Sequence, residues 1–245
     1  MIMKLIVAGS TGFVGAEIIR QALSNPHIVS VVALSRRPAP TPQNLEPTAD
    51  LTKLKSVTID DFGEEYPDSV KEELSNADAC IWTIAITPAK SRLNTWEQTV
   101  KVCRDYAIRG IETISQLPRG NANGKPFRFV YISGYNCERD QSKKPMWPLR
   151  DYLLMRGEAE SRILEFAQRS NGALAVLIAK PGLILGYGKI IPIAQRALMT
   201  VIGVPKIAVQ EISAALLDQV ENGFERDTLM SEDLSRIAAK HGGKK

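Results

Sequence analysis

Residues 4–15, KLIVAGSTGFVG, decide the fold of this chain. An apolar run over 4–8 leads into a glycine-rich turn, and a helical pattern of apolar residues follows over about 12–23. A second run, 29–34, is apolar or β-branched around one serine. This order predicts a βαβ unit, in which two parallel strands are joined by a crossover helix.

The remainder of the chain continues the same alternation. Apolar strand patterns recur four times, as SVTID, ACIWTIAI, FRFVYIS and ALAVLIA, and amphipathic helix patterns lie between them. Helices are expected at 67–76, 95–117 and from 151 onward, and later at 191–202, 211–222 and after Ser231. The pattern predicts an α/β fold with a doubly wound parallel sheet of six strands, the Rossmann fold. We expect one domain over 1–245, with 183–245 adding a small helical substrate lobe over the carboxyl ends of the strands.

Composition excludes several classes of function. The 245 residues are 44% hydrophobic and 24% charged, and the net charge of +4 comes from scattered basic residues, so no nucleic-acid partner is expected. The chain is expected to start inside its first strand, and no apolar run reaches spanning length, so we expect no integral membrane segment. The three cysteines, Cys80, Cys103 and Cys137, form no close pair, which favours a reduced, cytoplasmic location without disulfide or zinc site.

The two histidines narrow the chemistry further. His27 lies in a turn and His241 lies in the C-terminal tail, each far along the chain from a convincing acid or nucleophile. This argues against a Ser-His-Asp hydrolase and against most His-rich metal sites. Tyrosine, serine, lysine, arginine and carboxylates are left to carry any acid-base chemistry.

The glycine loop has the context of a dinucleotide fingerprint, because it follows a strand and opens a helix. Gly9 allows the tight turn, Gly12 allows a pyrophosphate to approach the helix terminus, and Gly15 allows the helix to pack close to the strand. The alternative is a glycine turn of an α/β fold that holds no ligand. The residues predicted to bind the cofactor here are Gly9, Ser10, Thr11, Gly12, Phe13, Val14 and Gly15.

The end of the second strand bears on which dinucleotide is bound. An acidic residue would hold the ribose 2′-hydroxyl of NAD, but the chain has Ser35, Arg36 and Arg37 there. A guanidinium matches a 2′-phosphate and Ser35 adds a donor, so NADP(H) is preferred, although both arginines would also be at home as solvated loop charges. After the third strand, Asp60, with Asp61, is a candidate for lying beside the adenine.

The motifs, taken in order, resemble those of the extended and atypical short-chain dehydrogenase/reductases. The glycine pattern is GxxGxxG, as in GSTGFVG, and it is followed by YISG at 131–134, by YLLMRGEAE at 152–160 and by KPGLILG at 180–186. Among these proteins the chain is most similar to the small NADP-binding Tat-interacting-oxidoreductase-like group and its fungal counterparts. The likeness spans nearly the whole chain.

The resemblance implies roles for particular residues. Ser133 would hydrogen-bond a substrate carbonyl and Tyr152 would donate or accept the proton, while Arg156 stands where the family has lysine. Arginine keeps a fixed positive charge near the tyrosine, but its planar fork cannot relay a proton. A tyrosine and an arginine four residues apart on a helix also commonly pack without catalysing anything. Pro181 and Gly182 would line the nicotinamide, and Thr83, Ile84 and Ala85 would face the ribose through their backbone.

The sequence is compatible with three functions. The first is NADPH-dependent reduction of a small apolar carbonyl compound, or the reverse oxidation. The second is cofactor binding without turnover in order to regulate a partner, and the third is isomerisation or cyclisation in the same pocket. Apolar residues at 183–185 and 190–191 hint at a small, apolar substrate molecule. The helix over 95–117 would suit either a homodimer contact or simple core packing, and the helix near Ile191 either a membrane surface or the interior of the lobe.

Overall fold

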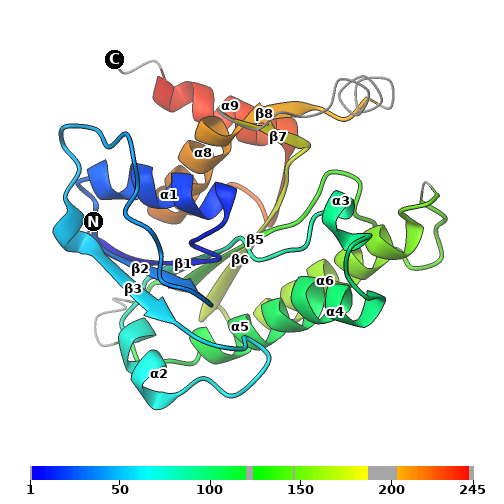
Figure 1. Ribbon diagram of the computed structural model, residues 1–245, viewed down its shortest axis with the longest axis horizontal. Helices are drawn as coiled ribbons and strands as arrows, with labels where there is room; N and C mark the ends of the chain where they lie inside the picture. Colours follow the sequence, from blue (N-terminus) through cyan, green and yellow to red (C-terminus); the bar gives the residue numbers. More distant parts are fainter. Residues whose placement is uncertain (1, 120–123, 146, 187–202, 243–245) are drawn as a thin grey trace.

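The protein is described by a computed structural model over residues 2–119, 124–145, 147–186 and 203–242 (Figure 1). Its centre is a sheet whose described strands run in the order β3-β2-β1-β4-β5-β6-β9, and every pairing is parallel. The strands are β1 (Met3–Ala8), β2 (Ile28–Ser35), β3 (Leu54–Thr58), β4 (Ala79–Trp82), β5 (Phe127–Ile132), β6 (Leu174–Lys180) and β9 (Thr228–Met230). The order reverses beside β1, which is the switch point where doubly wound sheets bind ligands.

Helices cover both faces of this sheet (Figure 1). One layer holds α1 (Phe13–Ser24), α8 (Val209–Asn222) and α9 (Ser231–Gly242). The other holds α2 (Asp68–Leu74), α4 (Trp96–Val100), a π-helical segment (Lys101–Asp105), α5 (Tyr106–Ile114) and α6 (Arg150–Gln168). Shorter elements are a 3₁₀ turn (Leu51–Lys53), α3 (Pro88–Ser91) and a separate parallel pair, β7 (Leu183–Leu185) and β8 (Lys206–Ala208).

The two faces of the sheet form two hydrophobic cores, because successive side chains of a strand point to opposite sides. In β1, Ile6 and Ala8 belong to the core shared with α5 and α6. Leu5 and Val7 belong to the core shared with α1, α8 and α9. Strands that are buried on both faces need continuous apolar runs, which explains the strand patterns in the sequence.

The predicted α/β fold with a doubly wound parallel sheet is confirmed, but several boundaries were wrong. The fourth strand ends at Trp82, and 83–87 form a loop. The helix expected over 95–117 is interrupted by the π-helical segment and ends at Ile114. The strands β7, β8 and β9 were not predicted, because three residues are too few to show a periodic pattern. The helix expected at 191–202 lies outside the described residues.

The C-terminal helices pack against the central sheet. The α8 and α9 helices cover a face of the sheet beside α1, and β9 extends the sheet next to β6. Burial of Ile212, Leu216 and Ile237 in the same core as β1 stabilises this position. No described helix combines the length and apolar character needed to cross a membrane.

Candidate functional site

The glycine loop is held tightly between β1 and α1. Gly9 has φ +86°, a left-handed conformation that favours glycine, and its N–H donates to the carbonyl of Leu34 at 2.9 Å. A Cβ at Gly15 would lie 2.5 Å from the carbonyl oxygen of Gly9, so α1 approaches the turn more closely than any side chain would allow. Gly12 precedes the helix and supplies no capping side chain, while Thr11 is exposed. The first N–H groups of α1 are therefore not capped by Gly12, as an anion-binding helix start requires.

The end of β2 is tied to this loop by two buried hydroxyls. Ser10 Oγ donates to Ser35 Oγ at 2.9 Å, and Ser35 Oγ donates to the carbonyl of Arg37 at 2.6 Å. The hydroxyl proton of Ser35 is therefore already donated to a backbone carbonyl of the protein. Arg36 and Arg37 are exposed, and within the described ranges neither guanidinium makes an ion pair or hydrogen bond. Two cations without an ion-pair or hydrogen-bond partner in the described ranges therefore lie at the end of β2 beside the glycine loop, where the carboxylate that would hold a ribose 2′-hydroxyl is absent.

The two aspartates after β3 have different surroundings. Asp60 is exposed. Asp61 accepts a hydrogen bond from Lys101 Nζ at 2.7 Å and another from the N–H of Gly63 at 2.8 Å. The Lys101 contact holds the pKa of the Asp61 carboxyl down at about 2. Asp61 thus anchors the 61–63 turn to the π-helical segment, and Asp60 is the aspartate left facing solvent.

The loop after β4 lies between the glycine loop and α6. Thr83 Oγ1 donates to the carbonyl of Ala8 at 2.8 Å, and the Ile84 side chain lies against Gly9. Ala85 is exposed. At the next residue, the N–H of Ile86 donates to Cys103 Sγ at 3.2 Å. Thr83, Ile84 and Ala85, which the sequence assigned to the cofactor, therefore follow the end of β4, and the first two contact the end of β1 and the glycine loop.

The first half of α6 carries the predicted proton donor and its arginine. Both side chains are buried, and the Tyr152 hydroxyl donates to the carbonyl of Ile86 at 2.8 Å. Burial raises the pKa of the Tyr152 phenol above its ordinary value, while the charge of Arg156 acts in the opposite direction. The phenol is therefore protonated at neutral pH.

Arg156 is only 2% exposed and points into the core. Its guanidinium donates to the carbonyls of Cys103 at 3.1 Å and Ile132 at 2.5 Å, and it stacks 4.7 Å from the centre of the Tyr131 ring. In the described part of the chain it has no carboxylate partner. Its fork joins the π-helical segment to the end of β5, so the arginine has a structural role in addition to its charge beside Tyr152.

Ser133 lies at the end of β5 but does not contact Tyr152 through a hydrogen bond. Its hydroxyl donates to Glu160 Oε1 at 2.5 Å. Glu160 is completely buried and also accepts from Arg139 at 2.7 Å and from Lys180 at 3.0 Å. A hydroxyl whose proton is engaged with a carboxylate has only its acceptor lone pairs free for a substrate.

Sequence reasoning missed the roles of Glu160, Lys180 and Arg139. A signal for Glu160 was present, because Tyr152, Arg156 and Glu160 follow one another at intervals of four on α6 and so share the buried face of the helix. A carboxylate at such a position needs a buried cation as partner. Nothing in the sequence indicated which cation would supply it.

The corner after β6 brings the last predicted residues near the site. Pro181 accepts a hydrogen bond from the N–H of Tyr135 at 2.9 Å, and Gly182 lies so close to Pro205 that a Cβ would be 2.0 Å from its carbonyl oxygen. The Phe13 ring of the glycine loop lies against Gly186. In the described ranges no group of three or more His, Cys, Asp or Glu side chains could hold a metal ion.

No protein-family model and no curated protein matches this chain. Several solved structures do match this chain. The complex of MoeE5 with UDP-glucuronic acid and NAD is 18% identical, with a TM-score of 0.67 over 98% of this chain and 82% of that one. Vestitone reductase from alfalfa (Medicago sativa L.) is 21% identical, with a TM-score of 0.65 over 93% and 76% of the two chains. The PhqB reductase domain from Penicillium fellutanum is 17% identical, with a TM-score of 0.68 over 94% and 67%.

These similarities, together with the strand order and the glycine loop, define the class of fold. The chain has a doubly wound Rossmann fold, and these solved structures share that fold. The predicted cofactor residues of the glycine loop, β2 and the β4 loop contact one another, and Tyr152 and Arg156 follow them on α6. The fold therefore places the candidate residues around the switch point of the sheet.

Proposed function

We propose that this protein binds NADP(H) and reduces a small, apolar carbonyl compound. The observation that carries the cofactor preference is the end of β2, where Arg36 and Arg37 are exposed beside the glycine loop. Guanidinium groups pair with a 2′-phosphate in bidentate fashion, and no carboxylate is present at this strand end to hold a 2′-hydroxyl. The cofactor would lie along the glycine loop, with Asp60 near the adenine, Thr83 facing the ribose, and Pro181 and Gly182 lining the nicotinamide.

The cofactor proposal is tested by calorimetric titration of NADPH and NADH. We expect NADPH to bind more tightly than NADH to the natural chain, and the Arg36→Ala/Arg37→Ala variant to lose at least tenfold in NADPH affinity with little change for NADH. Arg169→Ala is the control, since that arginine is 79% exposed at the C-terminal end of α6. Equal affinity for both nucleotides in all three proteins would overturn the preference, and no binding would overturn the whole proposal.

The chemistry of the proposed reaction fits the protonation state of Tyr152. Bound NADPH supplies a hydride to the carbonyl carbon. As the oxygen becomes negative, the buried, protonated Tyr152 donates its proton to it, and Arg156 stabilises the tyrosinate that remains. Ser133, which follows the end of β5, would polarise the substrate carbonyl by turning its hydroxyl proton from Glu160 toward the carbonyl oxygen. For the transfer, Tyr152 must give up its hydrogen bond to Ile86.

The catalytic proposal is tested by carbonyl-dependent oxidation of NADPH with a panel of small apolar aldehydes and ketones. Tyr152→Phe should lower kcat by at least a hundredfold and leave NADPH affinity within about threefold, because only the proton donor is lost. A Tyr152→Phe variant that turns over as fast as the natural chain would remove Tyr152 from the mechanism.

A second function is favoured by one observation: both Tyr152 and Arg156 are engaged with backbone carbonyls. Under this alternative, the protein binds NADP(H) without turnover and regulates a partner. Tight NADPH binding with no oxidation for any carbonyl compound, in the natural chain and in Arg156→Lys alike, is the result expected for a binding protein.

A further inference from the structure

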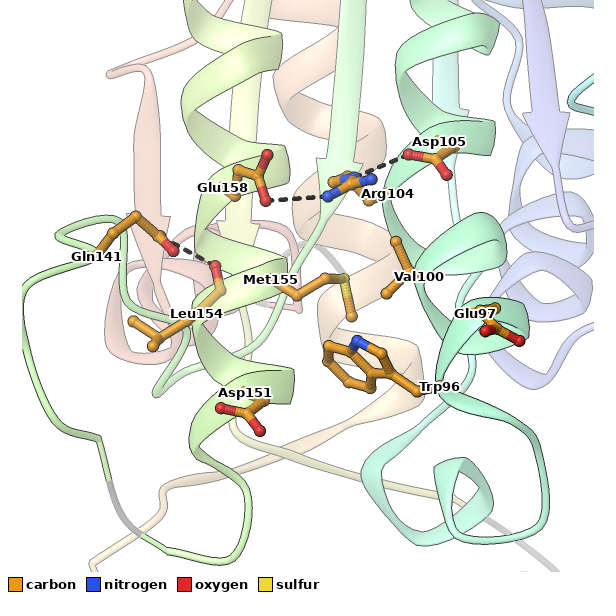
Figure 2. A pocket seen from close by; sticks show the side chains of 10 residues that line it. All are labelled: Trp96, Glu97, Val100, Arg104, Asp105, Gln141, Asp151, Leu154, Met155 and Glu158. Carbon is orange, nitrogen blue, oxygen red and sulfur yellow. Dashed lines mark hydrogen bonds and ion pairs between the residues drawn. The ribbon is translucent and has the colours of Figure 1, made fainter.

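A groove of about 640 Å³ lies between α4 and α6, and none of the residues that line it is assigned to the cofactor or to catalysis (Figure 2). The α4 helix and the π-helical segment form one wall of the groove, and α6 forms the other. Gln141, in the loop before α6, also lines it. Its lining residues are Trp96, Glu97, Val100, Arg104, Asp105, Gln141, Asp151, Leu154, Met155 and Glu158. The function proposed above uses none of these side chains, although Met155 packs in the same buried cluster as Tyr152.

The floor of the groove is apolar and its aromatic wall is open to solvent. Figure 2 shows the Trp96 indole between the two helices, next to Met155, with Val100 above it. Trp96 is 50% exposed, whereas Thr99 on the same helix is buried. A large aromatic ring left half exposed beside buried apolar side chains is typical of a surface that contacts another molecule.

The charge of the groove is opposite to that of the chain. Its lining holds four carboxylates and one guanidinium, whereas the whole chain carries a net charge of +4. Arg104 already binds Asp105 at 2.8 Å and Glu158 at 3.1 Å. Glu97 and Asp151, one on each wall, make no ion pair within the described residues. Two unpaired carboxylates therefore flank the exposed indole.

We propose that this groove binds a basic segment of a partner protein. A lysine or arginine of the segment stacks on Trp96 between Glu97 and Asp151, and a neighbouring apolar side chain packs on Val100 and Met155. An aromatic face attracts a cation, and the two carboxylates add to that attraction. A second copy of this chain fits less well, because a two-fold contact would set the acidic rims of both copies against each other.

The test uses two peptides of ten residues, acetylated and amidated. One combines arginine, leucine and serine, and its counterpart has glutamate in place of arginine. Calorimetry on the full chain should show binding of the basic peptide only. Trp96→Ala and Glu97→Gln/Asp151→Asn should each weaken it at least tenfold without changing NADPH affinity. The matched controls should change peptide affinity by less than twofold. One control is Glu64→Gln/Asp227→Asn, at two exposed carboxylates without ion pairs in the described ranges. The other is Trp147→Ala, at an indole that is 85% exposed.

Each other outcome overturns the proposal. Equal binding of both peptides, or no binding of the basic one, removes the basic partner. An equal loss in the Glu64→Gln/Asp227→Asn control shows that net charge alone attracts the peptide. A dimer in analytical ultracentrifugation that Trp96→Ala dissociates assigns the groove to a second copy. Thermal unfolding of each variant separates these results from misfolding.

Discussion

Lys180 Nζ lies 3.0 Å from Oε2 and 3.1 Å from Oε1 of Glu160, and both side chains are buried. The same carboxylate accepts from Ser133 and Arg139, and Lys180 also donates to the carbonyl of Cys137 at 2.6 Å. One side chain of α6 thus joins the end of β5, the end of β6 and the 133–139 loop. The position of Ser133 depends on this network.

Removal of the Glu160 charge should therefore destabilise the protein strongly. We expect Glu160→Gln to lower the free energy of unfolding by about 3–5 kcal/mol in urea, because Lys180 is left buried without its counter-ion. The control is Glu165→Gln on the same helix, where the side chain is 58% exposed and the cost should stay below about 0.5 kcal/mol. A double variant, Glu160→Met/Lys180→Met, should cost less than the two single changes together. Equal small costs for Glu160→Gln and the control would refute a structural role for the network.

Gly9 should tolerate no side chain, for a reason beyond its backbone angle. Gly9 and Gly172 have nearly the same φ, +86° and +85°, but a Cβ at Gly9 would lie 2.5 Å from Thr83 Oγ1, whereas one at Gly172 would contact nothing within 4 Å. Gly172→Ala should cost about 1 kcal/mol from the left-handed conformation alone. Gly9→Ala should cost at least about 2 kcal/mol and weaken NADPH binding more than tenfold. Equal costs for the two variants would show that the contact with Thr83 relaxes freely.

Arg156→Lys should destabilise the protein even though the charge is kept. A lysine ammonium cannot reach the carbonyls of Cys103 and Ile132 together in the geometry of the guanidinium fork, and it stacks less well on Tyr131. We expect a loss of about 1–2 kcal/mol in the free energy of unfolding, from one buried carbonyl left without a donor. Arg162→Lys, at a half-exposed position of α6, should change it by less than about 0.5 kcal/mol. An unchanged or higher stability of Arg156→Lys would contradict the structural role of the fork.

The Asp61–Lys101 pair should contribute stability that depends on pH. The pKa of Asp61 is about 2 in the folded protein, below its ordinary value, so the contribution is complete above about pH 4 and is lost as the pH falls through 2. Asp61→Asn should therefore cost up to about 1 kcal/mol at pH 5 and progressively less toward pH 2, a modest figure because the pair is partly exposed.

Urea unfolding of the natural chain and of Asp61→Asn at several pH values between 5 and 2 measures this difference. In a Lys101→Met background the effect of Asp61→Asn should become small and lose most of its pH dependence, because Lys101 is the main cause of the low pKa. A pH dependence that survives intact in that background would point to the N–H of Gly63 instead.

The features that the sequence predicted depend on short separations along the chain. Strand and helix patterns, the glycine turn and the run from Tyr152 to Arg156 on one helix all follow from periodicity or from spacings of a few residues. Preferences for strands, helices and turns that arise from such short spacings do not depend on distant contacts. The doubly wound fold could therefore be predicted from the sequence. The short strands β7, β8 and β9 could not, because their pairing partners, and not their three-residue patterns, define them.

By itself, then, the sequence determined the fold class, the place of the glycine loop and the presence of arginines at the end of β2. Tertiary structure alone decided that Ser133 binds Glu160, that Lys180 supplies the counter-ion and that Arg156 points into the core. These partners lie 20 to 53 residues apart in the chain. A buried charge must be matched by whatever cation, anion or carbonyl the packing brings to it, and packing is a property of the whole folded chain.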